Sequence, residues 1–288
     1  MSTQEIENKN TIIDSNETIV PIENENELGS NNSIVKEKKD IEKTLKKKNH
    51  LILKIILGLI SLIIIVLIVI CIIYLSTYSH ATKNALQFMQ SDNDVKVNKI
   101  DSGYFFDGPG TDKALIFYPG GKVDETAYSE ILNGLSKNGI DCYLVKMPFH
   151  LAIFGKNKAD KIINENKELY DKWYIAGHSL GGAMAAYYAS SHSDTIDGLA
   201  LLAAYSTKPI ADNVKVVTVL GTNDKVLNWD TYNNNKKNLP NNFTEVKIEG
   251  GNHGQFGDYG EQKGDGKATI PLLEQHNKTV SAILDAFN

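Results

Sequence analysis

The sequence predicts a mainly parallel, doubly wound α/β sheet preceded by one transmembrane helix. Apolar strand-like runs alternate with helical patterns from residue 95 to the C terminus. That alternation is typical of a parallel sheet with helices on both faces. Residues 51–75 are almost wholly apolar and long enough to span the hydrocarbon layer as a helix. The remaining 95–288 segment of this 288-residue chain is long enough for one sizeable domain.

The segment that precedes the apolar run is polar. Residues 1–50 lack enough apolar surface to offset the entropy cost of ordering, so we expect a disordered tail. The end of this tail is basic, with lysines at Lys36, Lys38, Lys39, Lys43, Lys46, Lys47 and Lys48. By the positive-inside rule, the tail is expected in the cytoplasm and residues 80–288 outside the cell membrane.

Residues 51–75 are expected to bind membrane lipid as a single-pass anchor. Lys54 near one end can reach the headgroups, and Tyr74 and Tyr78 at the other end suit the interface. A buried core helix would show an amphipathic stripe, which this run lacks. A cleavable signal peptide would begin nearer the N terminus and end in a small-residue cleavage site.

Charge and cysteine content argue against a nucleic-acid-binding protein and against a fold stabilised by disulfides. The formal net charge of −5 and the absence of a basic, aromatic-rich patch in the second half argue against a nucleic-acid partner. The two cysteines, Cys71 in the apolar span and Cys142 in a strand-like run, are not expected to form a disulfide. Cys142 is interpreted as a buried packing residue rather than a nucleophile.

After a polar linker at residues 76–94, the domain at residues 95–288 is predicted element by element. Two short strands open it and can pair as an antiparallel hairpin at one edge of the sheet. The predicted strands are 95–100, 103–107, 114–118, 142–147, a run beginning at Trp173, 199–204, 214–220 and 243–248. The predicted helices are 124–135, 159–169, one that ends near 191, a polar and partly helical 227–239, and 270–287.

A serine in a turn bounded by glycines lies at the centre of this pattern. Ser179 stands in Gly177-His178-Ser179-Leu180-Gly181, between the Trp173 strand and a helix of small residues. A tight strand-to-helix turn pushes a serine hydroxyl into a cleft, and glycines two residues away avoid collisions with the backbone. The free amides at the start of the helix favour a developing negative charge. The alternative is an ordinary turn with a solvated serine.

Two further polar side chains follow predicted strands. Asp224 comes after the 214–220 strand, and His253 follows the last strand after Gly250 and Gly251. The carboxyl ends of parallel strands meet at one edge of the sheet, so Ser179, Asp224 and His253 are expected to converge. This order and placement, with Pro119-Gly120-Gly121 after the 114–118 strand, resembles the α/β-hydrolase superfamily from about residue 95 to the C terminus.

Within that superfamily, the chain is similar to the compact serine esterases and dienelactone-hydrolase-like proteins. Dienelactone hydrolases use a cysteine nucleophile, and the serine here favours ester chemistry instead. The expected catalytic residues are Ser179 as nucleophile, His253 as base and Asp224 as the acid that orients it. The amides of Leu180 and Gly121 are the expected oxyanion donors, with Lys122 as an alternative to Gly121.

Alternative interpretations remain for several residues. His253 and Asp224 could be plain turn residues, and Asp230 is the substitute acid. His178 is interpreted as a packing or oxyanion-loop neighbour. Asp258 and Asp265 match no familiar calcium loop and are interpreted as solvated turn residues. No metal-ligand cluster and no dinucleotide motif stands out, so we expect no metal and no cofactor.

The expected function is cleavage of small or medium acyl esters through an acyl-enzyme intermediate. Only residues 205–213 connect two strands at the position where a helical cap would be inserted, so we expect an open site. Phe149, Leu151 and Phe154 are candidates for an apolar pocket, with packing at the sheet edge as their alternative role. An acyltransferase or thioesterase with the same triad, a peptidase, or a non-catalytic surface binding module are the rival functions. The sequence does not determine the oligomeric state.

Overall fold

The computed structural model describes residues 25–287, with side chains from residue 31 onward. The chain divides between Val69 and Ile70 into two compact units, which are described separately. The disorder predicted for residues 1–24 lies outside the described residues.

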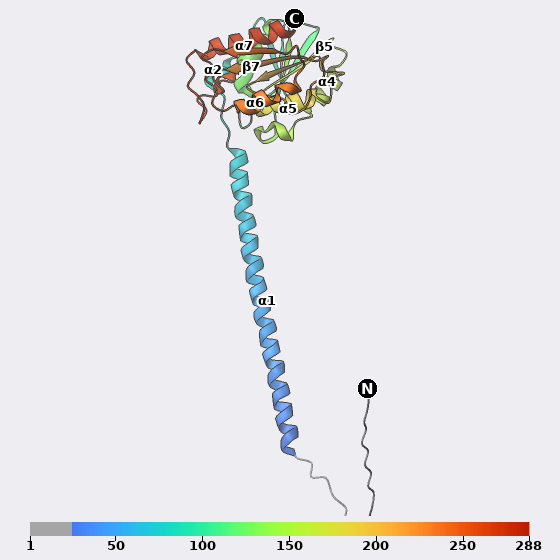
Figure 1. The fold of residues 1–288 in the computed structure, drawn as a ribbon, viewed down its shortest axis with the longest axis vertical. Coiled ribbons are helices and arrows are strands. Elements are labelled where there is room, and N and C mark those ends of the chain that lie inside the picture. The colour runs from blue at the N-terminus through green and yellow to red at the C-terminus, as the bar shows by residue number, and fades with distance from the viewer. Residues whose placement is uncertain (1–24, 288) are drawn as a thin grey trace, which may run out of the picture. The chain divides into compact units, whose positions relative to one another are not determined.

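Helix α1 runs from Glu25 to Ser76, and its residues up to Val69 make up the described part of the first unit (Figure 1). In the described part of the chain, α1 is the one helix long and apolar enough to cross a membrane. Its side chains are exposed from residue 31 to residue 74, unlike those of a core helix. Residues 25–50, for which we expect disorder, lie within α1 in this structure. Lys, Glu and Leu have high helix propensity, and the apolar segment that follows provides a nucleus from which the helix extends.

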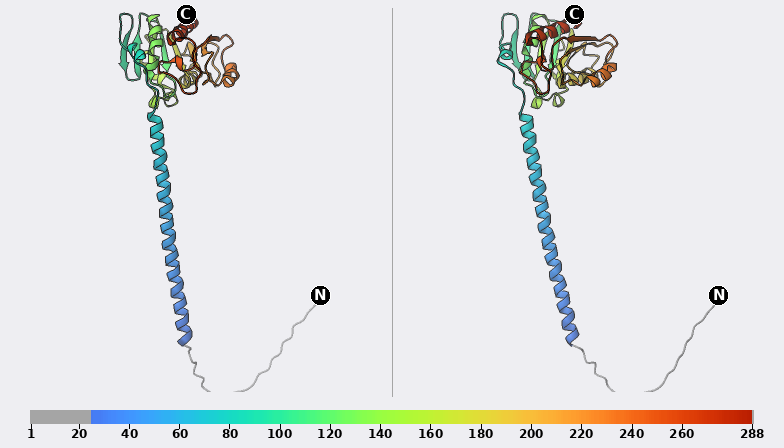
Figure 2. Two further views of the ribbon diagram at one scale, coloured as in Figure 1. Left: turned by 90° about the vertical axis from the view of Figure 1, so that its left-hand side faces the viewer. Right: turned by 60° about the vertical axis from the view of Figure 1, so that its left-hand side comes forward.

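The second unit is built on an eight-stranded sheet with the order β1-β2-β4-β3-β5-β6-β7-β8. The pairs β1–β2 and β2–β4 are antiparallel and all other pairs are parallel, which confirms the predicted hairpin at one edge (Figure 2). The strands are β1 Lys96–Ile100, β2 Gly103–Asp107, β3 Lys113–Tyr118, β4 Asp141–Val145, β5 Lys172–His178, β6 Gly198–Leu202, β7 Lys215–Gly221 and β8 Thr244–Ile248.

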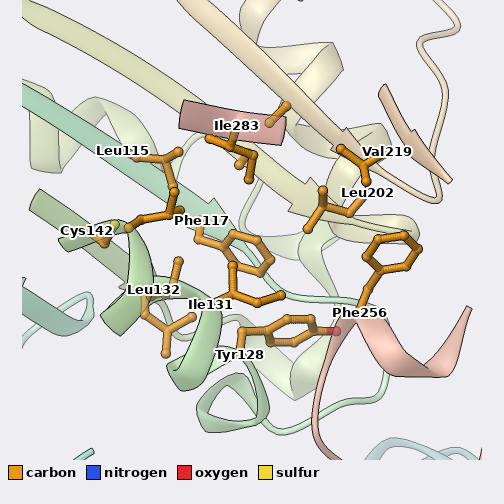
Figure 3. Packing of buried hydrophobic residues seen from close by; sticks show 14 of the residues in the cluster. Leu115, Phe117, Tyr128, Ile131, Leu132, Cys142, Leu202, Val219, Phe256 and Ile283 are labelled. Atoms are coloured by element: carbon orange, nitrogen blue, oxygen red, sulfur yellow. The ribbon is translucent and has the colours of Figure 1, made fainter. Parts of the chain in front are cut away.

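Helices cover both faces of the sheet (Figure 1). One face packs against α3 and α7, where Phe117, Ile131 and Ile283 meet in a fully buried cluster (Figure 3). The other face packs against α4 and α5 through Ile162, Ala185 and Ala189. The α-helices of this unit are α2 Lys83–Gln87, α3 Ser129–Lys137, α4 Lys158–Asn166, α5 Leu180–Ala189, α6 Trp229–Asn235 and α7 Leu272–Phe287.

Short 3₁₀ turns complete the unit. They are η1 Glu125–Tyr128, η2 Pro148–His150, η3 Ala152–Phe154, η4 Lys236–Asn238 and η5 Gly254–Phe256. Residues 203–214, between β6 and β7, contain no helix, so no helical cap is present at this position. The mainly parallel, doubly wound sheet that the sequence predicts is therefore confirmed.

Residues 76–94, which we expect to be a linker, make several contacts with the rest of the second unit. Helix α2 lies within them, and Ala85 on this helix is fully buried. The Ala85 carbonyl accepts a hydrogen bond from Ser129 Oγ at 2.5 Å, and Thr82 N donates to the Asp258 carbonyl at 2.9 Å. The polar composition of this segment predicts exposure, but its few apolar side chains find partners only after the chain has folded.

Candidate active site

Ser179 occupies the turn between β5 and α5. Its backbone is in the left-handed region, with φ 52° and ψ −120°. Ser179 N donates to the Leu202 carbonyl of the neighbouring strand β6 at 2.9 Å, which holds the turn against the sheet. Such a strained conformation persists only where the surroundings fix it, and it projects a half-buried Ser179 beyond the strand end.

The flanking glycines are required by close backbone contacts. A Cβ atom on Gly181 would lie 2.1 Å from the Tyr118 carbonyl oxygen and 2.2 Å from that of Pro119. A Cβ atom on Gly177 would lie 2.5 Å from the Gly181 carbonyl carbon. The serine turn therefore packs directly on the loop that follows β3, where the oxyanion donors are expected.

Asp224 is fixed by the loop that follows β7. Its Oδ1 accepts hydrogen bonds from the backbone amides of Val226 and Leu227, both at 2.8 Å. Its own carbonyl accepts from Trp229 Nε1 at 2.9 Å. The carboxylate is completely buried and its remaining oxygen, Oδ2, is left to face His253.

His253 follows β8 and forms a pair with Asp224. His253 Nδ1 lies 2.8 Å from Asp224 Oδ2, and the imidazole is 2% exposed. Gly221, at the end of β7, packs so closely on Gly251 that a Cβ atom would lie 2.5 Å away, which brings the two loops together. An aspartate oxygen only accepts, so Nδ1 carries the proton and Nε2 is left with a free lone pair.

The serine turn adjoins this pair through His178. The His178 and His253 rings are 4.6 Å apart between centroids. Among the described residues, Ser179 Oγ makes no hydrogen bond, so the serine–histidine bond expected of a triad is absent from this structure. Such bonds are often long in ligand-free enzymes and tighten when substrate binds.

The two expected oxyanion donors lie side by side. A Cβ atom on Gly121 would lie 3.0 Å from Leu180 Cδ2. Neither Gly121 N–H nor Leu180 N–H is engaged in a backbone hydrogen bond within the described residues. The alternative donor, Lys122 N–H, already donates to the His150 carbonyl at 2.7 Å. Gly121 N–H is therefore a better candidate than Lys122 N–H for the second oxyanion donor.

Tyr128 connects the loop after β3 with the serine turn after β5. The sequence analysis did not identify this residue. Gly120 N–H donates to the Tyr128 hydroxyl at 3.0 Å, and that hydroxyl lies 2.9 Å from His178 Nδ1. Complete burial raises the pKa of Tyr128 well above its usual value, so the hydroxyl keeps its proton. Burial, and then the nearby His253, lower the pKa of His178 well below its usual value. A tyrosine at this position gives no sequence signal, because it looks like any core aromatic.

Two aspartates in the Gly-rich segment after His253, which we expect to be solvated, make hydrogen bonds within the fold instead. Asp265, expected to be solvated, binds both loops of the acid–base pair. Its Oδ2 accepts from Gly254 N at 2.8 Å, and its Oδ1 accepts from Lys225 N at 3.2 Å. Asp258 is 5% exposed and accepts from Asn84 Nδ2 at 3.0 Å. Both carboxylates find donors only after folding, Asp265 in the loops after β7 and β8 and Asp258 on α2.

The three candidate pocket residues lie in the η2–η3 region. Leu151 is half-buried and its Cδ2 would lie 3.7 Å from a Cβ atom on Gly121. The Phe149 and Phe154 side chains are 56% and 59% exposed, with ring centroids 5.8 Å apart. Asp230, the substitute acid, is exposed in the first turn of α6. In residues 25–287, no group of three His, Cys, Asp or Glu side chains could hold a metal ion.

The model of the alpha/beta hydrolase family matches residues 114–277, which is more than half of the chain. The chain belongs to the alpha/beta hydrolase family. The match includes Ser179, Asp224, His253 and both oxyanion candidates, and it confirms the resemblance predicted from the sequence.

The chain is also similar to solved structures, and the one with a TM-score above 0.5 that is described first has the same fold. A dienelactone hydrolase from Anabaena variabilis ATCC 29413 is 12% identical with a TM-score of 0.51, over 68% of this chain and 100% of that one. Est1E from Butyrivibrio proteoclasticus is 14% identical with a TM-score of 0.49, over 67% of this chain and 99% of that one. The comparison with curated proteins returned no match.

Proposed function

We propose that this chain is a membrane-anchored serine hydrolase that cleaves carboxylic esters through an acyl-enzyme intermediate. The observation that carries the proposal is the buried His253–Asp224 pair, 2.8 Å apart, beside a serine held in a left-handed turn. A packing histidine does not need a buried carboxylate on one ring nitrogen and a free lone pair on the other. A general base needs both.

In the proposed acylation step, Ser179 Oγ attacks the carbonyl carbon of the ester. Its proton passes to His253 Nε2, and Asp224 stabilises the imidazolium that forms. The carbonyl oxygen becomes an oxyanion, which the free amides of Gly121 and Leu180 can bind. The tetrahedral intermediate then expels the alcohol, which takes the proton from His253.

Deacylation reverses these roles with water. A water molecule attacks the acyl carbonyl carbon while His253 takes a proton from it. His253 then returns this proton to Ser179 Oγ as the acyl–serine bond breaks. The free acid leaves and the enzyme is restored. An alcohol, amine or thiol acceptor in place of water would make the same site an acyltransferase, so product analysis separates these activities.

The first test is labelling of the full chain with a fluorophosphonate probe, with Ser179→Ala as the paired variant. Labelling of the parent protein alone would support an activated serine at the turn, and a chain-length series of esters and thioesters would follow. A folded parent protein that is not labelled would contradict the proposal and would favour a non-catalytic binding module.

We further propose that α1 anchors the hydrolase, with the lysine-rich segment in the cytoplasm and residues 80–288 outside the cell. The lysine cluster precedes the apolar segment, and the C-terminal flank has little charge before Lys83. Protease added to intact cells should remove the hydrolase unit and spare the tail. Protection of the hydrolase unit would contradict this orientation.

A further inference from the structure

The segment 148–154, which we term the aromatic loop, presents apolar side chains to solvent. Phe149, Ile153 and Phe154 are 56%, 54% and 59% exposed. Phe149 and His150 both have a left-handed backbone, with φ 54° and 53°. A left-handed non-glycine residue costs free energy, so two in succession persist only where the surroundings fix them. Exposed apolar groups gathered on one loop mark an interaction surface.

The chain that leaves α1 is fastened to this loop. Helix α1 ends at Ser76, and the Tyr78 ring stacks on the His150 ring with centroids 3.8 Å apart. Ser79 N donates to the Lys122 carbonyl at 2.8 Å, and Ser79 O accepts from Asp124 N at 2.8 Å. Two residues of extended chain reach about 7 Å. The aromatic loop therefore lies within a short reach of Ser76, which belongs to the same unit.

Basic residues flank the aromatic loop in the sequence. Lys146 precedes it, and Lys156 and Lys158 follow it. The Lys146 side chain is 64% exposed, and its one acidic neighbour within ion-pair distance, Glu125, is buried. Lys146, Phe149 and Lys158 line one groove together with Tyr78. An apolar tip with a cationic rim is complementary to a bilayer with anionic headgroups.

We propose that the aromatic loop docks into the headgroup layer of the membrane, and that the substrates are acyl esters held in that bilayer. This inference rests on the proposed function, because it uses both the anchor and the ester chemistry. Leu151 on the same loop packs beside Gly121, so a lipid surface at Phe149 and Phe154 continues directly to the expected oxyanion site. The partner that these side chains fit is the bilayer rather than a second protein.

The depth of the loop can be measured on the full chain in vesicles of phosphatidylcholine and phosphatidylglycerol. The Cys71→Ser background leaves only Cys142, which is buried and whose pKa is raised by that burial, so it does not react with a thiol label. A nitroxide is attached at Ile153→Cys and, as the matched control, at Leu169→Cys, another exposed apolar position. We expect a several-fold lower collision rate with a water-soluble nickel chelate at position 153. Equal collision rates would overturn the docking.

A second experiment tests whether the substrate reaches the site from the bilayer. Turnover of a long-chain ester within the vesicles is divided by turnover of a short soluble ester. Ile153→Asp should lower this ratio about tenfold, because burial of a large apolar side chain is worth more than a tenfold change in an equilibrium constant. Leu169→Asp should leave the ratio unchanged. An unchanged ratio for Ile153→Asp would overturn delivery from the bilayer.

The outcomes also separate this inference from the function on which it rests. If neither ester is cleaved by the parent protein, the proposed hydrolase activity is wrong, while the nitroxide depth still decides the docking. If alkaline carbonate extracts the full chain from the vesicles, the transmembrane anchor is refuted, and the nitroxide depth still decides the docking. An anchored, active enzyme with a water-exposed loop refutes the docking alone.

Discussion

Asp224 and Asp230 are six residues apart, and their surroundings assign them different roles. The Asp224 carboxylate is buried, accepts two backbone amides and faces His253, whereas Asp230 is exposed in the first turn of α6. A carboxylate that accepts from Nδ1 keeps the other imidazole nitrogen free for a proton from serine. This contrast gives a paired test.

Asp224→Asn should lower turnover by roughly 10³–10⁴-fold, because an amide nitrogen facing His253 Nδ1 would place the imidazole proton on Nε2. Asp230→Asn should leave turnover of a soluble ester within about twofold of the parent. Steady-state kinetics on the purified full chain measures both. A large loss with Asp230→Asn and none with Asp224→Asn would exchange their assigned roles.

His178 should make the stability of the hydrolase unit depend on pH. Burial, and then the neighbouring His253, lower the pKa of its folded imidazole well below the usual value of 6.5. Below about pH 6.5 the unfolded chain therefore binds a proton that the folded chain does not, so stability falls as the pH falls. Above this pH the penalty is absent.

The difference in melting temperature between about pH 7 and about pH 5 should be smaller for His178→Gln than for the parent. The melting temperature at a single pH is not informative, because loss of the His178–Tyr128 hydrogen bond lowers stability at every pH. The change in melting temperature between the two pH values isolates the effect of the imidazole. Tyr128→Phe removes the same hydrogen bond and keeps the imidazole, so it should retain the parent's pH dependence. Equal slopes for the parent and His178→Gln would contradict this assignment.

At the scale of elements, the loop from Gly254 to Gly266 holds the ends of β7 and β8 together. Asp265 accepts hydrogen bonds from the loop that carries Asp224 and from the one that carries His253. Asn252 Nδ2 adds a bond to the Gly266 carbonyl at 2.7 Å. We therefore expect Asp265 to act as a positioning residue for the acid–base pair.

Asp265→Asn should lower kcat about tenfold, because one of its two oxygens becomes a donor that cannot accept from Lys225 or Gly254. Glu261→Gln, an exposed change in the same loop, is the control. Kinetics on a soluble ester, with thermal unfolding in parallel, separates positioning from stability. A lower melting temperature with an unchanged kcat would assign Asp265 a structural role only.

At the scale of the whole molecule, the segment between α1 and β1 belongs to the packed hydrolase unit. Ser79 bridges Val123, Thr82 bonds Asp258, and Ala85 is fully buried against α3. Removal of this segment would strand Ser129 Oγ and the Asp258 side chain without their partners. Each hydrogen bond lost in this way, with its group opened to water, costs about 0.5–1.5 kcal/mol, to which the lost burial of apolar side chains adds.

A fragment of residues 95–288 should therefore melt about 5–10 °C below a fragment of residues 77–288. Both are compared by circular dichroism at equal protein concentration. Equal melting temperatures would show that residues 77–94 act only as a linker.

Much of the molecule could be predicted from local sequence patterns. Continuous apolar runs such as Ala114–Tyr118 are typical of strands buried on both faces, and their alternation with helical patterns indicates a doubly wound sheet. The glycines around Ser179 and after β8 marked the sharp turns, so Ser179, Asp224 and His253 were placed correctly at three strand ends. Their catalytic roles stay predictions.

The contacts between groups far apart in the sequence became visible only in the folded chain. Tyr128 and Asp265 stand among ordinary core and loop residues, and their bonds to His178 and Gly254 join segments far apart in the sequence. The same holds for Tyr78 on His150 and for the burial of Ala85. Sequence periodicity reports which side of an element faces a core, because that depends on local geometry. Side-chain partners across the fold depend on how the elements pack, and no local pattern encodes that.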